Sequence, residues 1–436
     1  MALSQSRRSA LKQKPIAIFG FGVSGRGVRA LAERMGYEAT IFDEKEIAGT
    51  RQAFSTGDAH QHSLVVMSPG FQEDHPWVIF ARVAGLEVMT ELDFGALFLS
   101  RGVYAVTGSN GKTTTTEFLA HTLNIVGQNA VAVGNNGRAL CAWLAENLEN
   151  EPNTRLVVEI SSFQAGRLQH LNIEGLIWTD FCENHLDVHA DMETYFAHKW
   201  HLVSRLTGPL MVIGESVFEY ITKNGIELPE FALVVANQSN SPSDILPAGT
   251  PFEHPPFDED FRLCVAFGER AGIPRILFHQ AANTFKLPPH RLTKIAELNG
   301  VTFYNDAKSS TFEATLSALK RFDKPVRWIG GGKSKGGDIV GFAKILAPKI
   351  KSAYLIGETA ETLGKTLSKE GVPATVFANI ENAVKSAFVE ATRGDVILFS
   401  PGFSSLDQFE NFVQRGNLFE KHVLMLLSHE DAHTRV

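Results

Sequence analysis

The chain has 436 residues, of which 44% are hydrophobic and 20% charged, a composition typical of a soluble globular protein with roughly two to four domains. There are 41 Lys and Arg residues against 48 Asp and Glu residues, and the resulting net charge of −7 argues against broad nucleic-acid or membrane binding. The three cysteines have no paired spacing and no hydrophobic run approaches transmembrane length, so we expect a reduced, cytoplasmic compartment and no membrane insertion.

The first elements of the chain predict a nucleotide-binding βαβ unit. The basic N-terminus lacks a hydrophobic segment and is expected to be a short disordered extension. A strand over 16–19 is followed by the turn Gly20-Phe-Gly-Val-Ser-Gly25 and a helix over 26–35. The next strand, 38–42, ends in Asp43, as in dinucleotide-binding units. An ordinary βα turn has the same appearance, so the pattern alone leaves both interpretations open.

Further strands divide the chain into three α/β segments. The strand at 64–67 ends in Ser68-Pro-Gly70, a loop of the kind that lines ligand crevices. We expect a first domain over 1–94, a central domain over 95–288 and a third over 289–436. The residues at 235–260 are rich in Pro, Ser, Asn and Asp and predict a connector. Strands are predicted in the central domain at 103–106, 131–133, 156–160, 175–178 and 210–213, and in the third at 301–304, 326–329, 352–356, 374–377 and 396–399.

The most informative stretch is residues 105–115, Ala-Val-Thr-Gly-Ser-Asn-Gly-Lys-Thr-Thr-Thr. Its glycines allow backbone N–H groups to wrap phosphate oxygens, Lys112 can neutralise the outer phosphates and Thr113 can ligate Mg²⁺. A strand enters the loop and a helix over 114–125 leaves it, which adds the positive end of a helix. The usual first glycine is replaced by Val106. A chance Gly/Thr-rich turn is the weaker alternative.

Other polar residues lie at strand ends. Glu159 ends an apolar strand, where a carboxylate commonly completes Mg²⁺ coordination, although a surface ion pair would explain it too. Four histidines, His185, His189, His198 and His201, make a zinc site conceivable, but no cysteine or H-E-x-x-H accompanies them. Ser404 and Ser405 are expected at a helix start, where they would cap the helix or bind a carboxylate.

Taken together, the motifs resemble the Mur ligases, ATP-dependent amino-acid ligases of peptidoglycan synthesis, from Ile16 to about Phe419. The motifs are Thr107-Gly-Ser-Asn-Gly-Lys-Thr113, Glu159-Ile-Ser-Ser-Phe-Gln164, Glu183-Asn-His-Leu-Asp187 and Asn305-Asp-Ala-Lys308. The turn Gly20–Gly25 and the segment Ser405–Gly416 are similar to the branch that adds D-glutamate to UDP-N-acetylmuramoyl-L-alanine. The resemblance implies an ADP-forming ligase with a Rossmann-like N-terminal domain, a central P-loop ATPase-like domain and a Rossmann-like C-terminal domain.

The resemblance also implies residue roles. The catalytic residues would be Lys112, Glu159, His185 and Lys199. Two Mg²⁺ ions would be held by Thr113, Glu159, His185 and Lys199, with Lys199 carbamylated by CO₂. ATP would be bound by Gly108, Ser109, Asn110, Gly111, Lys112, Thr113, Thr114, Arg291 and Asp306. The UDP-sugar substrate would be bound by Val23, Ser24, Asp43, Gly70, Asn135, Ser161 and Gln164. Glutamate would be bound by Ser310, Lys335, Ser405, Leu406 and Phe412.

Two positions depart from the family pattern. The usual His-Asn-x-x-Asn corresponds to residues 256–260, where Asp260 stands in place of the second Asn and cannot donate as an amide does. Ser310 stands where the branch usually has Thr. Three alternatives remain: an NAD-linked oxidoreductase, a non-catalytic nucleotide-binding protein, and a related ligase that adds L-glutamate or uses another UDP-muramoyl acceptor. A monomer is expected.

Overall fold

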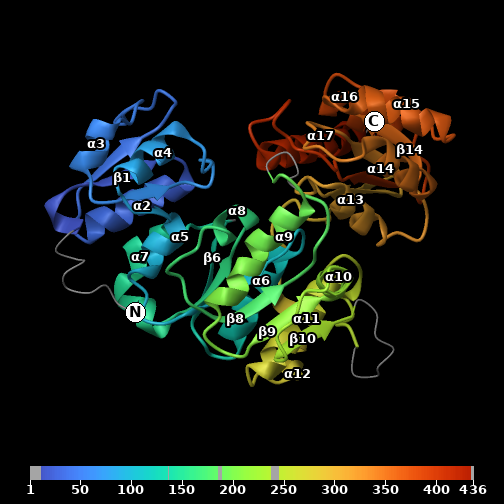
Figure 1. Cartoon of the computed structure of the whole chain (residues 1–436). Helices are drawn as coiled ribbons and strands as arrows, with labels where there is room; N and C mark the ends of the chain where they lie inside the picture. The colour runs from blue at the N-terminus through green and yellow to red at the C-terminus, as the bar shows by residue number, and fades with distance from the viewer. Residues whose placement is uncertain (1–10, 136, 185–188, 237–244, 434–436) are drawn as a thin grey trace. The chain divides into compact units, whose positions relative to one another are not determined.

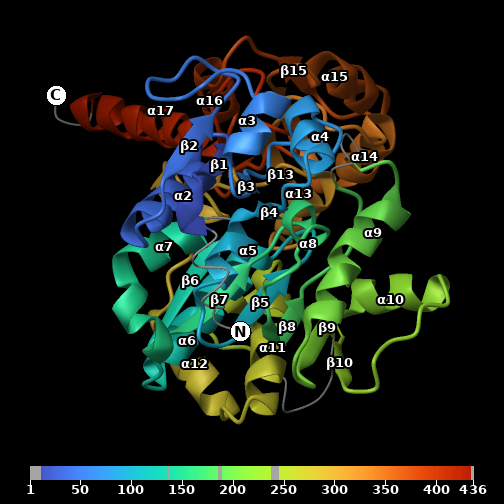
Figure 2. The same ribbon diagram turned by 60° about the vertical axis from the view of Figure 1, so that its left-hand side comes forward.

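The computed structural model describes residues 11–135, 137–184, 189–236 and 245–433, with side chains up to residue 428. Three separate sheets of four, six and six strands, with helices between the strands, confirm the predicted α/β class (Figures 1 and 2). Contacts divide the chain into two compact units. Unit 1 comprises Met1–Phe181, Glu193–Pro247 and Glu259–Phe285, and unit 2 comprises Cys182–Met192, Ala248–Asp258 and Lys286–Val436. The expected N-terminal extension falls largely on residues 1–10, outside the described residues.

The first sheet, in unit 1, has four parallel strands in the order β2–β1–β3–β4. Its elements are β1 (Ile16–Phe19), α2 (Val23–Arg34), β2 (Ala39–Phe42), α3 (Thr56–Gln61), β3 (Val65–Met67), α4 (Pro76–Val83), β4 (Val88–Thr90) and α5 (Glu91–Ala96). Aromatic side chains form its core, because Phe19, Phe42, Phe54 and Trp77 meet edge to face with ring centroids 4.8–6.3 Å apart. A Cβ at position 25 would lie 1.8 Å from the carbonyl oxygen of Gly20, so only Gly25 lets α2 start this close to β1.

The second sheet, also in unit 1, is parallel throughout, in the order β10–β9–β8–β5–β7–β6. Its strands are β5 (Val103–Thr107), β6 (Ala130–Gly134), β7 (Arg155–Glu159), β8 (Ile173–Trp178), β9 (Met211–Gly214) and β10 (Ala232–Val235). The helices along this part of the chain are α6 (Lys112–Ile125), α7 (Leu140–Asn147), α8 (Ser162–Ala165), α9 (Met192–Trp200), α10 (Glu215–Lys223), α11 (Phe257–Arg270) and α12 (Arg275–Thr284). Because β5 lies between β7 and β8, the loop that follows it is surrounded by neighbouring strand ends.

The predicted connector at 235–260 is wrong at its C-terminal end. Residues 237–244 lie outside the described residues, but helix α11 begins at Phe257. This helix buries Phe261, Leu263, Cys264 and Phe267, a spacing that follows one face of a helix. The Pro-rich residues that precede it concealed that periodicity.

Polar contacts from helix α5 join the elements of the first sheet to those of the second. Glu91 and Asp93 are 2% and 0% exposed. The Glu91 carboxylate accepts the Cys141 N–H at 2.6 Å in the first turn of α7, and burial raises the pKa of Glu91 to about 7. The Asp93 carboxylate accepts the N–H groups of Gln169 and His170 at 3.0 and 2.8 Å. Both contacts lie within unit 1, so α5 anchors two layers of one compact body.

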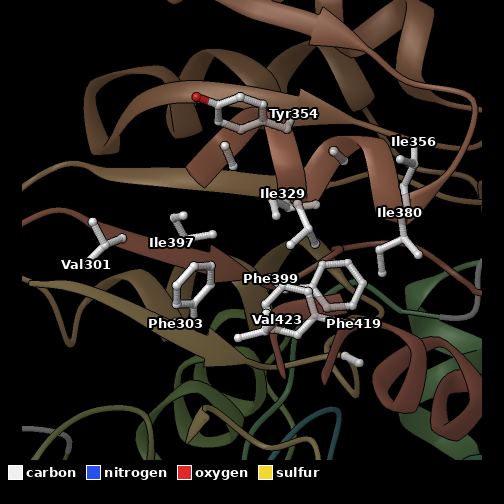
Figure 3. Close-up of a cluster of buried hydrophobic side chains, with 14 residues drawn as sticks. Val301, Phe303, Ile329, Tyr354, Ile356, Ile380, Ile397, Phe399, Phe419 and Val423 are labelled. Carbon is white, nitrogen blue, oxygen red and sulfur yellow. The ribbon is translucent and has the colours of Figure 1, made fainter. Parts of the chain in front are cut away.

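The third sheet, in unit 2, has the order β11–β12–β16–β13–β14–β15, with only its edge strand β11 antiparallel. Its elements are β11 (Thr293–Leu298), β12 (Val301–Asn305), α13 (Phe312–Leu319), β13 (Val326–Gly330), α14 (Ile339–Leu346), β14 (Ile350–Leu355), α15 (Ala360–Lys369), β15 (Ala374–Val376), α16 (Ile380–Val389), β16 (Val396–Phe399) and α17 (Phe412–His433). Figure 3 shows the core on one face, where Phe399 of β16 stacks on Phe419 of α17 at 4.7 Å. No helix among the described residues is long and apolar enough to span a membrane.

Candidate active site

The predicted phosphate-binding loop lies between β5 and α6, as the sequence indicates. Gly111 is the N-cap of α6 with φ of 74°, a left-handed conformation, and it makes no side-chain cap. The Lys112 Nζ folds back and donates to the carbonyl oxygens of Gly108 and Ser109 at 2.9 and 2.8 Å. The Thr114 hydroxyl is buried and finds no hydrogen-bond partner among the described residues. The loop thus has a helix N-terminus, a lysine and a spare hydroxyl available for an anion.

Glu159 and Thr113 come together beside this loop. Strand pairing sets Glu159 opposite Val106, and the Thr113 hydroxyl donates to Glu159 Oε2 at 2.6 Å. Asn135 donates its amide to Glu159 Oε1 at 3.0 Å. Glu159 is 2% exposed, so its partners are these polar groups and not a surface lysine. A hydroxyl, a carboxylate and an amide oxygen are the ligand types that Mg²⁺ accepts.

A carboxylate that sequence reasoning missed also contacts the loop. Asp180 Oδ1 accepts the backbone N–H groups of Ser109 and Asn110, both at 2.7 Å, and its Oδ2 accepts the Asn110 side-chain amide at 3.0 Å. Asp180 follows β8, and 70 or more residues separate it from its partners. Because β8 neighbours β5, Asp180 reaches the loop across a sheet register that no local motif encodes.

Lys199, on α9, points into the same region. Its side chain is 1% exposed, and its Nζ donates to the Gly108 carbonyl at 2.6 Å and lies 4.9 Å from the Tyr195 ring centre. His185 lies outside the described residues, so its predicted place beside Lys199 stays a prediction. Among the described residues no group of three or more His, Cys, Asp or Glu could hold a metal ion, which leaves the conceivable zinc site without support.

The residues predicted to bind the UDP-sugar lie on α2 and on the loops after β2 and β3 beside the first sheet, at Asn135 after β6 of the second sheet, and at the start of α8. Asp43 accepts the N–H of Phe21 at 2.7 Å and so shapes the turn after β1. Val23 is 59% exposed, and Gly70 is exposed on the loop after β3. Ser161 and Gln164 bond each other in a capping box at the start of α8, with the Ser161 hydroxyl 2.9 Å from Gln164 Oε1. These last two side chains therefore have a structural task as well.

Asp260, at the departure from the family pattern, lies against the start of α6. Its Oδ1 accepts the Thr115 hydroxyl at 3.0 Å, and the residue is 4% exposed. A Cβ on Gly111 would lie 2.3 Å from the same oxygen, so Asp260 requires glycine at the loop end. The carboxylate thus accepts a hydrogen bond at a place where an amide could also have donated one.

In unit 2, two of the five predicted glutamate residues, Ser310 and Lys335, line a small hollow of about 40 Å³. Lys335 Nζ donates to the Ser310 hydroxyl at 3.2 Å, and both line the hollow with Phe403. Ser405 is 6% exposed and Leu406 is 64% exposed on the loop after β16. The prediction that Ser404 and Ser405 begin a helix is wrong, because α17 begins at Phe412 and Ser404 instead pairs with Lys333 through backbone hydrogen bonds.

Two further predicted residues lie in unit 2: Asp306, predicted to bind ATP, and Phe412, predicted to bind glutamate. Asp306 accepts the hydroxyls of Ser309 and Ser400 at 2.5 and 2.7 Å. Burial raises its pKa to about 6, although these hydrogen bonds and the Arg291 charge oppose the rise. The Phe412 ring lies 3.9 Å below the Lys308 ammonium.

One buried residue of this loop region was not anticipated. Arg415 of α17 is 1% exposed and donates to the carbonyls of Phe403 and Ala307 at 3.0 and 2.9 Å. It therefore ties together the two loops that carry Ser405 and Ser310. In the sequence, Arg415 is only an arginine three residues after the aromatic Phe412, and a surface arginine can have the same spacing.

Comparison with known proteins agrees with this geometry. The Mur ligase middle domain matches residues 106–234, and the Mur ligase, glutamate ligase domain matches residues 290–403. The UDP-N-acetylmuramoylalanine–D-glutamate ligase of Chlamydia pneumoniae is 31% identical over 427 residues, which cover 93% of this chain and 97% of the relative. The enzyme of the same name from Protochlamydia amoebophila (strain UWE25) is 29% identical over 442 residues, which cover 95% of this chain and 98% of the relative.

Solved structures share the fold. The UDP-N-acetylmuramate-alanine ligase MurC of Thermotoga maritima matches with a TM-score of 0.61 over 94% of this chain and 99% of its own, at 15% identity. The MurF ligase of the same species, solved in complex with ADP, matches with a TM-score of 0.56 over 96% of this chain and 97% of its own, at 16% identity. Sequence identity of 31% along nearly the whole chain, two matching domain models and this shared fold show that the chain belongs to the Mur ligase family.

Proposed function

We propose that this chain is an ATP-dependent, ADP-forming ligase that joins D-glutamate to UDP-N-acetylmuramoyl-L-alanine, a step of peptidoglycan precursor synthesis. The observation that carries the proposal is the pairing of Thr113 with Glu159 at 2.6 Å directly after Lys112. An NAD-linked oxidoreductase would have no use for this pair. The curated relatives of nearly equal length carry the name of this ligase, which supports the choice of substrates.

The residues of the predicted phosphate-binding loop suit a nucleoside triphosphate. The N-terminus of α6, the Lys112 ammonium and the orphaned Thr114 hydroxyl all favour phosphate oxygens. We assign ATP to this loop, and the ADP bound by the related MurF ligase supports the assignment. When ATP binds, Lys112 must leave the carbonyls of Gly108 and Ser109, to which it now donates, and turn to the phosphates.

Mg²⁺ fits the cluster of Thr113, Glu159 and Asn135, whose oxygens are hard ligands in a buried place. When bound there, Mg²⁺ would neutralise phosphate charge during transfer. Glu159 supplies the negative charge that holds the ion, and Asn135 orients that carboxylate through its amide donor. The rest of the chemistry belongs to the substrates and to the residues that align them.

The proposed reaction has two steps. An oxygen of the alanyl carboxylate attacks the γ-phosphorus, the bond to the bridging oxygen breaks and ADP leaves. The uncharged amine of glutamate then attacks the carbonyl carbon of the acyl phosphate, the bond from that carbon to the phosphate oxygen breaks, and the amide forms while the amine proton leaves with the phosphate as HPO₄²⁻. Lys112 compensates charge in the first step. In the second step, the Lys335 ammonium can bind a glutamate carboxylate. The hydrogen bond that Lys335 donates to the Ser310 hydroxyl orients the lysine side chain.

The proposed carbamate at Lys199 rests on the place of that side chain. The nitrogen of a neutral lysine amine attacks the carbon of CO₂, one C=O π bond breaks and a proton is released to solvent, and the resulting carbamate is an anionic oxygen ligand that suits a second Mg²⁺. Lys199 is buried and its Nζ is already 2.6 Å from the backbone of the phosphate-binding loop. A carbamate nitrogen keeps one N–H, so it can still donate to the Gly108 carbonyl while the carbamate oxygens are available to a cation.

The test is an ADP-release assay with purified protein, UDP-N-acetylmuramoyl-L-alanine, and D- or L-glutamate in parallel. We expect amide product and ADP with D-glutamate and none with L-glutamate. Lys112→Ala should abolish both, because the phosphate charge then lacks its cation. Equal rates with the two enantiomers would refute the proposed specificity, and intact ATP in the complete mixture would refute the proposed reaction.

A further inference from the structure

We infer that Arg167 is a positioning residue for the UDP-sugar substrate: it holds the substrate loop, residues 68–75 between β3 and α4, against the segment that carries Ser161 and Gln164. The inference deepens the proposed function and rests on it. Arg167 lies just after α8, and its partners lie about 95 residues earlier in the chain.

Three contacts make the link. Arg167 Nη1 donates to the Phe71 carbonyl at 2.8 Å, Nη2 donates to the Gln72 side-chain oxygen at 3.3 Å, and Nε lies 3.2 Å from Glu73 Oε1. The guanidinium therefore uses its whole fork on three successive residues of the substrate loop. The Arg167 side chain is 14% exposed, so these bonds are sheltered from water. Burial lowers the pKa of Arg167, and the Glu73 carboxylate opposes that change.

The other end of the substrate loop is fixed against the turn after β1. The Ser68 hydroxyl donates to the Gly20 carbonyl at 3.3 Å, and the Phe71 ring stacks on Trp77 at 5.6 Å. The loop thus touches the turn that carries Val23 and Ser24 on one side and the segment after α8 on the other. Five of the predicted UDP-sugar residues, Val23, Ser24, Gly70, Ser161 and Gln164, lie on or beside these segments, with Gly70 between the two fixed points.

A substrate that contacts both layers requires the two layers to keep a fixed position relative to each other. Without Arg167, the Phe71 carbonyl and the Glu73 carboxylate lose their donor from the segment after α8, while the Ser68 hydroxyl still contacts the Gly20 carbonyl. The substrate loop, with Gly70, would then no longer be held at a fixed place relative to the segment after α8. Substrate binding must then bring the two layers back to their fixed relative position, and the free energy this requires weakens the affinity for the UDP-sugar. The groups that act in phosphate transfer are not affected.

Arg82→Ala is a matched control. Arg82 donates to the same Glu73 carboxylate, to Oε2 at 2.6 Å, but it is 49% exposed and comes from α4, so it does not bridge the layers. Both variants lose one arginine and one ion pair with Glu73. Only Arg167→Ala also loses the link between the substrate loop and α8.

The experiment measures KM and kcat for each substrate in the wild type, Arg167→Ala, Arg167→Lys and Arg82→Ala. For Arg167→Ala we expect KM for the UDP-sugar to rise roughly 10-fold or more, with kcat and KM for ATP and glutamate within about 2-fold. Arg167→Lys, which keeps the charge but not the fork, should fall between, and Arg82→Ala should match the wild type. An unchanged KM for the UDP-sugar, or equal effects of the two alanine variants, would overturn the inference.

Two measurements keep the test independent of turnover. Amide hydrogen exchange should speed up in residues 68–75 of Arg167→Ala and not of Arg82→Ala, and calorimetry with UDP-N-acetylmuramoyl-L-alanine should show the same loss of affinity. If the wild type binds this nucleotide but forms no amide, the proposed function fails while the inference about Arg167 stands. Unchanged exchange and unchanged binding refute the role of Arg167 whatever the activity.

Discussion

Glu91→Gln offers a quantitative test of how the buried carboxylate of α5 behaves. Burial raises the pKa of Glu91 from 4.5 to about 7, with the Cys141 hydrogen bonds opposing the rise. At 1.36 kcal/mol per pKa unit, the ionised carboxylate costs the folded state about 3 kcal/mol. Because the folded pKa exceeds the unfolded one, the unfolded chain releases its proton first as the pH rises. Stability contributed by the protonated form is therefore lost between pH 4.5 and 7, and about 2.5 kcal/mol of the loss falls between pH 5 and pH 8.

Glutamine keeps an oxygen for the Cys141 N–H, 2.6 Å away in the wild type, but has no proton to lose. We expect the free energy of unfolding of Glu91→Gln, relative to the wild type, to rise by about 2.5 kcal/mol from pH 5 to pH 8. The assay is urea denaturation at several pH values, followed by tryptophan fluorescence, since Trp143 is buried in α7. Glu149→Gln, at an exposed ion pair, is the control. Parallel pH profiles for Glu91→Gln and the wild type would refute the reasoning.

Three further outcomes follow from the site and from unit 2. Lys199→Ala should lower kcat by about 100-fold or more and recover partly when short carboxylates are added, whereas an unimpaired variant would remove the carbamate from the mechanism. Lys335→Ala should raise KM for glutamate roughly 10-fold while the exposed Lys333→Ala does not, so equal effects would show that only general positive charge matters. Asp395→Asn should destabilise the fold by about 3 kcal/mol at pH 7, because the buried Arg327 loses its nearer carboxylate, 2.8 Å away, and keeps only that of Glu390 at 3.7 Å. Burial raises the pKa of Asp395, but its hydrogen bonds with Thr392, Lys351 and Arg327 outweigh this and lower it. The stability that the carboxylate contributes is therefore present above pH 3.8 and lost in acid. Chemical denaturation of both proteins at pH 7 and pH 3 is the test, and an equal difference in unfolding free energy at the two pH values would contradict this account.

The sequence predicted the strands of the three sheets well because buried parallel strands are short apolar runs that end in glycine-rich turns. Phe19, Val106 and Ile329 each end such a run and each lies in a core. The edge strands β4, β10 and β11 were not predicted: β4 is only three residues long, and β10 and β11 are only partly buried and lack that signature. Asn299 and Gly300, both with positive φ, form the two-residue turn between β11 and β12, a hairpin signal that the sequence analysis did not use.

The candidate site was predictable where residues act locally and not where they act across the sheet. Gly111, Lys112 and Thr113 are neighbours in sequence, so their predicted roles come from one loop. Asp180 and Arg167 act at separations of 70 residues or more, set by strand order and layer packing. Such pairings leave no periodicity in a single sequence, and a lone Asp or Arg has the same appearance as a surface charge.

The contact between Asp180 and the phosphate-binding loop bears on inhibitor chemistry. Two N–H groups of the loop, those of Ser109 and Asn110, already point at a carboxylate. A polyanionic competitor must either evict Asp180 or tolerate its charge, while its remaining donors are those at the start of α6. A compound that pairs a phosphate mimic with an ammonium or amidinium group facing Asp180 would convert that repulsion into attraction, and would gain selectivity over enzymes whose loop lacks the acid.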